Sequence, residues 1–205
     1  MPLNFIQETG GNAYIRFMVT DNEWVMSGAA GMEKVDISTQ AVIVDIENIQ
    51  LGWLKLEGGR DWQPWENNTP PDGKKPPTDQ HEQGFSVMFY STKLFEDEPV
   101  RELSASGAGV RQFVMDLHEE AEKSKEFGSG KVPAIKIGEA PRVKMGKNSS
   151  RVPKFEIVKW VNRPEALSGD VPPPEKTAPP ISPAVSQSSG ASDDVDFGDD
   201  NDDEI

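Results

Sequence analysis

Positively charged side chains gather in one stretch of this chain, residues 131–163 (KVPAIKIGEAPRVKMGKNSSRVPKFEIVKWVNR). The stretch holds nine basic and two acidic residues, a net charge of +7, whereas the whole chain of 205 residues carries −14. Lysine and arginine release condensed counterions from phosphate backbones, so this composition favours binding to a polyanion. The predicted phosphate contacts are Lys136, Arg142, Lys144, Lys147, Arg151, Lys154 and Lys159.

Aromatic side chains supply the second half of this chemistry. Proteins that bind single-stranded nucleic acids combine a positive groove with rings on which bases stack, each stack worth about 1–3 kcal/mol. Trp62 and Trp65 lie in a polar, proline-rich segment, and Trp160 follows Lys159. We expect these three tryptophans to stack on bases. The alternatives are a cluster that anchors the loop for Trp62 and Trp65, and a place in the core for Trp160.

Alternation in the basic stretch predicts how its charges are displayed. Arg142 and Lys144 alternate with Val143 and Met145. Because neighbouring side chains of a strand point to opposite faces, the two bases should share one face and the two apolar residues the other. We expect a charged outer face over a buried inner face. An ordinary solvated strand face is the alternative.

The elements that must position these residues are mostly strands. Strand-like patterns are found at residues 13–20, 24–26, 41–57, 84–95, 132–137, 142–145 and 154–161. Apolar residues at helical spacing predict a single helix at 107–127, with its buried stripe at Val110, Phe113, Val114, Leu117 and Ala121. Residues 60–83 are expected to form a long loop and residues 146–150 a turn, while Asn48 marks a bulge or turn.

This order of strands, one helix and a closing hairpin is similar to that of small Greek-key barrels of the OB type. We therefore predict a mainly β fold with one helix, an OB-fold-like β-barrel, over residues 1–167. Residues 168–192 are rich in proline and serine and have no apolar period, so we expect a disordered linker. Residues 193–205 form an acidic tail.

Composition narrows the class of protein further. The chain has no cysteine, which excludes disulfides, thiolate metal sites and cysteine nucleophiles. Residues 1–164 carry a net charge of only −4, so most of the acidity belongs to linker and tail. There is no signal-peptide pattern and no apolar run near the ~20 residues that span a bilayer. We expect a soluble, cytoplasmic protein that makes no membrane contact.

The C-terminal tail carries a resemblance to a known family. A proline- and serine-rich linker that ends in acids and an apolar residue resembles the architecture of bacterial and phage single-stranded DNA-binding proteins. That family's tail usually ends in Phe, whereas this chain ends in Ile205, and Phe197 is a second apolar residue. The residues that match are Asp199, Asp200, Asp202, Asp203, Glu204 and Ile205. Residues 40–167 also look like phage-encoded proteins of this kind.

The resemblance implies a protein that coats single-stranded DNA in replication or recombination and recruits partner proteins through its tail. As a tethered polyanion, the tail should also compete with DNA for the basic face. We expect no cofactor, no metal and no catalysis, and the sequence does not give the oligomeric state. The alternative is an adaptor whose acidic tail binds a basic protein and which ignores DNA.

Patterns that suggest an enzyme are incomplete. Gly107 and Gly109 begin a dinucleotide-binding motif that lacks its third glycine, and Gly146-Lys147 ends a P-loop that lacks its first. His81 and His118 lie in no recognisable motif, and His118 is expected on the polar side of the helix. Asp45 and Glu47 share a predicted strand face and suggest a Mg²⁺ nuclease, but no E-x-K motif follows them.

Overall fold

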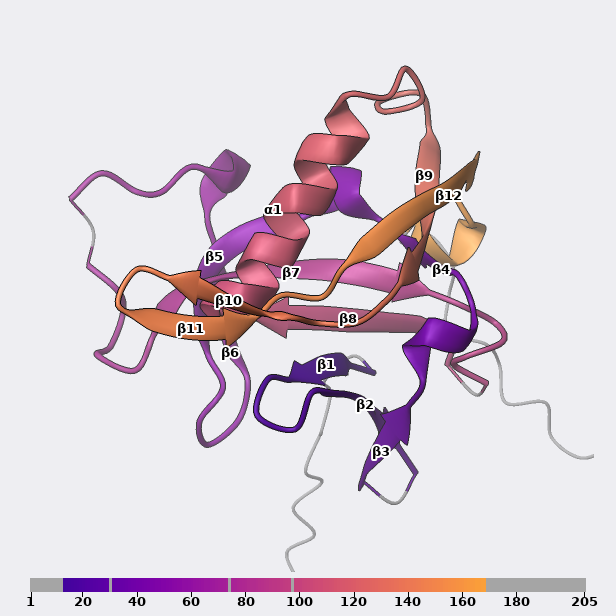
Figure 1. Cartoon of the computed structure of the whole chain (residues 1–205). Helices are drawn as coiled ribbons and strands as arrows, with labels where there is room; N and C mark the ends of the chain where they lie inside the picture. The colour runs from indigo at the N-terminus through magenta and orange to yellow at the C-terminus, as the bar shows by residue number, and fades with distance from the viewer. Residues whose placement is uncertain (1–12, 30, 74, 97, 169–205) are drawn as a thin grey trace, which may run out of the picture. The chain divides into compact units, whose positions relative to one another are not determined.

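The computed structural model describes residues 13–29, 31–73, 75–96 and 98–168. The chain divides into two units, residues 1–171 and 172–205, and every described residue belongs to the first. The predicted linker from residue 169 onward and the predicted acidic tail lie outside the described residues. The described part is mostly β-structure with a single α-helix, as predicted (Figure 1).

Seven strands form the largest sheet, and all its pairs are antiparallel. In spatial order they are β12 (Phe155–Asn162), β9 (Lys131–Ile137), β4 (Val42–Val44), β7 (Glu82–Tyr90), β5 (Gln50–Lys55) and β6 (Asp61–Pro64), with β8 (Val100–Ala105) also paired to β7. A smaller sheet comprises β1 (Ile15–Met18), β2 (Glu23–Gly28) and β3 (Gly31–Val35). The strands β10 (Arg142–Met145) and β11 (Asn148–Arg151) form a separate hairpin.

The large sheet forks along one edge of β7. The first half of β7 pairs with β5 and its last two residues pair with β4, while β8 occupies the opposite edge. Between β4 and β5 the chain makes a 3-10 turn, η2 (Ile46–Asn48), which confirms the predicted break at Asn48. On one branch of the fork β4 pairs with β9, and on the other β5 pairs with β6, so the two branches diverge. No sheet of the described residues closes into a barrel, which differs from the predicted closed barrel.

The helix α1 (Ala108–Glu122) lies over one face of the large sheet (Figure 1). All five residues of its predicted apolar stripe are buried. The Phe113 ring meets the Phe155 ring of β12 edge to face, with centroids 5.8 Å apart. The helix ends five residues earlier than predicted and is followed by turns, in which Gly128 and Gly130 adopt positive φ angles of 75° and 78°.

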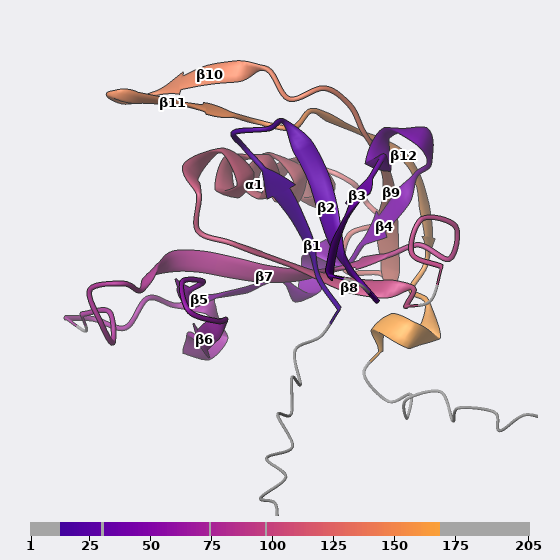
Figure 2. The ribbon, with the colours of Figure 1, turned by 90° about the horizontal axis from the view of Figure 1, so that it is seen from below.

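The core lies between the large sheet, α1 and the small sheet (Figure 2). Trp24 of β2 joins the three layers, since its ring centroid is 6.3 Å from that of Phe89 in β7 and 6.3 Å from that of Phe113 in α1. The small sheet is attached to the edge of β8, where Tyr14 forms a parallel bridge with Glu102. None of the described helices combines the length and apolarity that crossing a bilayer requires.

Several strands were not predicted from the sequence. The predicted loop at residues 60–83 contains β6, and the predicted turn at 146–150 contains most of β11, which leaves only Gly146 and Lys147 between β10 and β11. The strand predicted at 84–95 ends at Tyr90. The strands β3 and β8 were not predicted at all. Each of these segments is polar, strongly exposed or interrupted by buried charges, so its alternation is weak.

Candidate nucleic-acid interface

The basic stretch of the sequence folds into one long antiparallel ribbon, residues 131–162, which we call the basic ribbon. Its first part is the pair β9–β12 and its last part the hairpin β10–β11. Backbone hydrogen bonds continue the pairing between these parts. The Gly138 amide donates to the Lys154 carbonyl (2.8 Å), the Lys154 amide to the Glu139 carbonyl (2.9 Å) and the Val152 amide to the Pro141 carbonyl (3.1 Å).

The tip of the basic ribbon, residues 142–151, is its most positive part, and we call it the distal hairpin. It contains four basic residues and no acid. Arg142 pairs directly with Arg151, and Lys144 pairs with Ser149, so the three basic side chains leave the same face. Like charges directly opposite each other on a sheet are destabilising, and a bound anion would remove this repulsion.

The other face of the distal hairpin rests on α1. A Cβ atom at Gly109 would overlap the Arg151 carbonyl oxygen and lie 2.5 Å from Ser150 Oγ, so only glycine allows this close approach. Met145 on this face is half-buried against the core, whereas Val143 is 38% exposed. The predicted division into a charged and a buried face therefore holds for Arg142, Lys144 and Met145 but not for Val143.

Arg151 has a buried donor that the fold leaves unused. Its Nη1 donates to the Ala140 carbonyl oxygen at 3.1 Å. Its Nε is buried and has no hydrogen-bond partner among the described residues. Leaving a buried donor unsatisfied costs about 1–3 kcal/mol.

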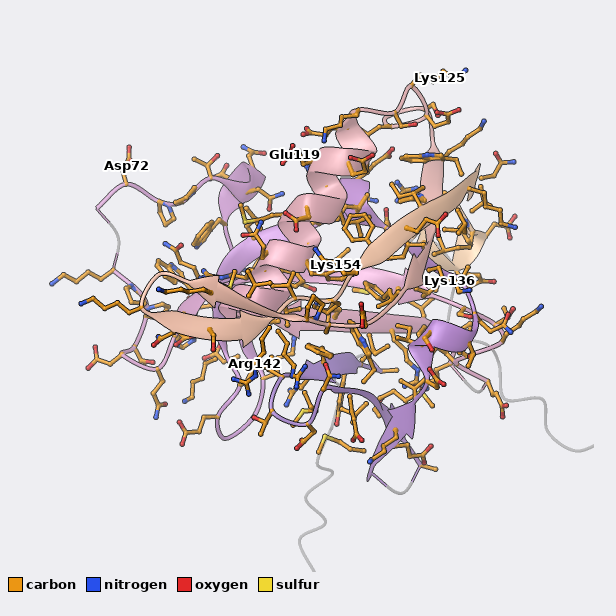
Figure 3. All side chains as sticks on the ribbon, in the orientation of Figure 1. Asp72, Glu119, Lys125, Lys136, Arg142 and Lys154 are labelled. Carbon is orange, nitrogen blue, oxygen red and sulfur yellow. The ribbon has the colours of Figure 1, made fainter. Side chains whose placement is uncertain are left out.

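The remaining predicted bases follow the basic ribbon toward the large sheet. Figure 3 shows Arg142, Lys154 and Lys136 at successive points along it. Lys136 is directly opposite Glu156, and Lys159 is opposite Ala134 on the same face of the β9–β12 pair. All of these bases are exposed. Because Glu156 offsets one charge in this part, the positive potential is concentrated at the distal hairpin.

Trp160 does not share that charged face. It pairs with Pro133 and is half-buried against the core, on the side of β12 opposite to Lys159. This placement favours the core alternative, and stacking by Trp160 stays a prediction.

The structure separates the other two predicted tryptophans. Trp62 is directly opposite Leu54, whereas Trp65 packs edge to face on Trp53, with centroids 5.3 Å apart. Trp53 and Leu54 are neighbours in β5, so their side chains point to opposite faces of the sheet. Trp65, which packs on Trp53, and Trp62, which is opposite Leu54, therefore also lie on opposite faces. The Arg60 guanidinium lies 5.8 Å from the centre of the Trp62 ring.

Trp65 borders a groove of about 600 Å³ between α1 and the strands β5 and β7. Its indole Nε1 is buried without a partner among the described residues. Arg111 of α1 also lines the groove, two residues after Gly109, which touches the distal hairpin. The groove and the distal hairpin therefore both border α1. Its apolar lining consists of Ile49, Leu51, Trp65, Phe85, Val114 and Met115.

Glu102 shows how the fold uses a charge internally. This carboxylate is only 4% exposed, forms an ion pair with Arg60 and accepts hydrogen bonds from the hydroxyls of Ser86 (2.6 Å) and Ser104. Burial alone would raise the pKa of Glu102. The Ser104 and Ser86 hydroxyls and the Arg60 charge outweigh burial and hold that pKa below its ordinary value.

The residues that suggested enzymatic chemistry also have partners in the fold. Arg163 Nη1 lies 2.6 Å from both carboxylate oxygens of Asp45, and its Nη2 is 3.1 Å from Glu47 Oε2. Arg163, the last base of the basic stretch, is therefore neutralised within the fold. Within the described residues, no group of three or more acids and histidines is placed to hold a metal ion.

Both histidines have polar neighbours in the fold. His81 is buried, with Nδ1 2.8 Å from Thr78 Oγ1 and Nε2 3.2 Å from Asp61 Oδ2. His118 is on the partly exposed side of α1, as predicted, with Nδ1 3.5 Å from Glu122 Oε2.

Comparison with known proteins identifies no relative, since no family model, no curated protein and no solved structure matches the chain.

Proposed function

We propose that the chain is a non-catalytic single-stranded DNA-binding protein whose main phosphate contacts lie on the distal hairpin. One observation carries the proposal: Arg142 and Arg151 face each other across a hairpin with four bases and no acid. A folded protein gains nothing from that repulsion unless an anion binds there. A strand of phosphates provides anions at regular spacing along Arg142, Lys144, Lys147 and Lys154.

The groove beside the distal hairpin supports a single strand over a duplex. Bases of a single strand are free to leave the backbone and cover apolar surface, and stacking on aromatic rings tolerates any sequence. Trp65 offers such a ring next to Arg111. The acidic tail, which resembles that of single-stranded DNA-binding proteins, supports the same function. The proposal includes coating of DNA during phage replication or recombination in a bacterial cytoplasm, with the tail recruiting partner proteins.

A titration tests this function directly. Oligo-dT and a duplex of equal length are titrated at two salt concentrations, with tryptophan fluorescence as the signal. Full-length chain is compared with chain ending at Ala191. We expect oligo-dT to bind more tightly than the duplex, to weaken with salt and to bind more tightly without the tail. Absence of binding to either DNA by both chains would overturn the proposal.

The alternative function is an adaptor that binds protein through the groove or the tail. Met115, 64% exposed at the rim of the groove, is the observation that favours it. An adaptor would show no salt-sensitive quench with oligo-dT. Loss of the tail would then abolish capture of partner proteins rather than strengthen binding to DNA.

A further inference from the structure

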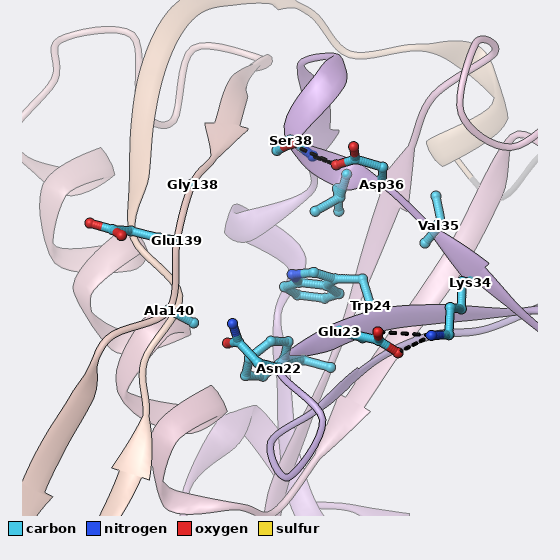
Figure 4. A pocket seen from close by; sticks show the side chains of 12 residues that line it. Asn22, Glu23, Trp24, Lys34, Val35, Asp36, Ser38, Gly138, Glu139 and Ala140 are labelled. Atoms are coloured by element: carbon cyan, nitrogen blue, oxygen red, sulfur yellow. Dashed lines mark hydrogen bonds and ion pairs between the residues drawn. The ribbon is translucent and has the colours of Figure 1, made fainter.

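A second pocket lies at the root of the basic ribbon, away from the groove at Trp65. It has a volume of about 430 Å³, within the range of about 300–1,000 Å³ that is typical of small-molecule sites. Strands β2 and β3, the 3-10 turn η1 (Ile37–Thr39) and residues 138–140 of the basic ribbon surround it (Figure 4). It therefore joins the small sheet to the point where the basic ribbon leaves the large sheet.

Trp24 forms the floor of this pocket (Figure 4). The side chain is only 7% exposed, and three aromatic rings of the core hold it in place. Its indole Nε1 makes no hydrogen bond to a described residue, and unlike the indole nitrogens of Trp62 and Trp65 it is not shut off from solvent. This accessible donor at the pocket wall can donate to an acceptor on a ligand.

Two polar side chains complement this donor. Figure 4 shows the Asn22 carboxamide and the Asp36 side chain at the edges of the pocket, and Glu139 pointing away from it. Asp36 Oδ1 accepts from the amide (3.1 Å) and hydroxyl (2.6 Å) of Ser38, which fixes the carboxylate. Its charge therefore favours a donor group on the ligand. Glu23 contributes less, because it is paired with Lys34 at 2.8 Å.

These groups describe a flat ring that presents an acceptor next to an amino group. Cytosine carries this pair at N3 and N4, and adenine at its ring nitrogens and N6. Asparagine pairs with adenine, and a carboxylate accepts from the cytosine amine, in known recognition of bases. Thymine has an oxygen in place of the amine. We propose that the Trp24 pocket binds a cytosine or adenine base of the strand that the basic ribbon holds.

The basic ribbon connects the pocket to the phosphate contacts. Gly138 and Glu139 at the pocket wall form backbone hydrogen bonds with Lys154, an exposed base on the partner strand of the ribbon. Arg142 follows Ala140 by two residues. We expect a strand whose phosphates lie on Lys154 and Arg142 to place one of its bases at the Trp24 pocket. The inference rests on the proposed function and adds to it a preference for amino-bearing bases.

Oligo-dC and oligo-dT of twelve nucleotides form the sharpest pair of probes, since both are pyrimidine strands that differ at the group facing the pocket. We expect the full-length chain to bind oligo-dC about tenfold more tightly than oligo-dT. Trp24→Phe keeps an aromatic ring in the core and removes the N–H donor together with part of the side-chain volume, so its free energy of unfolding is measured alongside. Asn22→Gly removes the carboxamide and suits the positive φ of 60° at this position.

Both variants should bring the ratio of affinities close to one without weakening binding of oligo-dT. Trp53→Phe, at a half-buried tryptophan outside this pocket, serves as the control and should keep the ratio. Equal affinities of the full-length chain for both strands, or a ratio unchanged by Trp24→Phe and Asn22→Gly, overturn the pocket proposal alone. Failure to bind either strand overturns the proposed function as well.

Discussion

Two hairpins of this protein contain similar residue types and use them in opposite ways. The β5–β6 hairpin, residues 50–64, has as many bases as acids, and Lys55 is directly opposite Asp61. Its Arg60 forms an ion pair with buried Glu102 and lies over Trp62. The distal hairpin has four bases, no acid and two arginines directly opposite each other. One hairpin pairs bases with acids within the fold, and the other contains no acid to pair with its bases.

The difference teaches how to separate structural from functional charge in a chain that is acidic as a whole. A basic residue count gives equal weight to Arg163 and Arg142. The structure shows that Arg163 neutralises Asp45 and Glu47, whereas Arg142 meets another arginine. Only a charge such as that of Arg142, which lies opposite a like charge, destabilises the fold when no anion is bound.

Neutralising the distal hairpin should abolish most binding to DNA without unfolding the protein. For Arg142→Ala, Lys144→Ala and Lys147→Ala combined, we expect an affinity for oligo-dT lower by about a hundredfold at 0.1 M salt. The slope of log affinity against log salt should fall by about 2, since each lost phosphate contact on a single strand removes about 0.7. The free energy of unfolding should stay within about 1 kcal/mol because all three side chains are exposed.

The matched control removes the same charge elsewhere. Lys75, Lys93 and Lys125 are exposed and lie outside the basic ribbon. Their combined change to alanine should leave the salt slope nearly unchanged. Equal losses in the two triple variants would mean that net charge, and not the distal hairpin, determines binding.

Arg60→Ala should have the reverse profile. It removes the ion-pair partner of a carboxylate that is 4% exposed, so the free energy of unfolding should fall by about 2–3 kcal/mol. Chemical denaturation measures this loss. Affinity for oligo-dT should change less than in the hairpin variant. If Arg60→Ala left stability intact and removed DNA binding, the contrast between the two hairpins would be wrong.

Gly109→Ala tests the close packing of the distal hairpin against α1. A Cβ atom would overlap the Arg151 carbonyl, so the hairpin or the helix must move. Alanine also favours the helix by about 1 kcal/mol, and we expect a net loss of stability of about 1 kcal/mol. DNA affinity should fall severalfold because the hairpin shifts relative to the groove. Gly107→Ala, with no atom near its Cβ position, is the control.

The sequence revealed those parts of this arrangement that follow from local periodicity. The α1 stripe was predicted with the correct face, and β10 with its charged face and buried Met145 but not with a buried Val143, because apolar residues recur at the period of the element. In contrast, β8 carries Arg101 and Glu102 at buried positions, and only their partners in distant segments make this possible. The polar strand β11 exists because β10 pairs with it. Local patterns contain no record of such long-range partners.

The same limit applies to the candidate interface. A cluster of nine bases was visible in the sequence, but the opposition of Arg142 and Arg151 depends on the register set by a two-residue turn. The placement of Trp62 and Trp65 on different faces depends on β6, whose four residues include Pro64. Trp24 lacked any sequence signal for a pocket because one wall of that pocket comes from the distant residues 138–140.

The smallest predicted effect concerns pH and sharpens the contrast between the hairpins. The pKa of Glu102 lies below its ordinary value of 4.5 in the folded protein, so its ionised form stabilises the fold above that value. This contribution is lost as the pH falls through the folded pKa. Glu102→Gln lacks it, and its free energy of unfolding should therefore decrease less than that of the unchanged chain between pH 7 and pH 3.

The distal hairpin contains no acidic residue and no histidine. Affinity of the Glu102→Gln variant for oligo-dT should therefore match that of the unchanged chain at pH 7 and at pH 5. Equal pH dependence of unfolding in the two chains would show that the Arg60–Glu102 pair contributes nothing through ionisation. The β5–β6 hairpin would then be held by packing of Trp62 rather than by its internal charges.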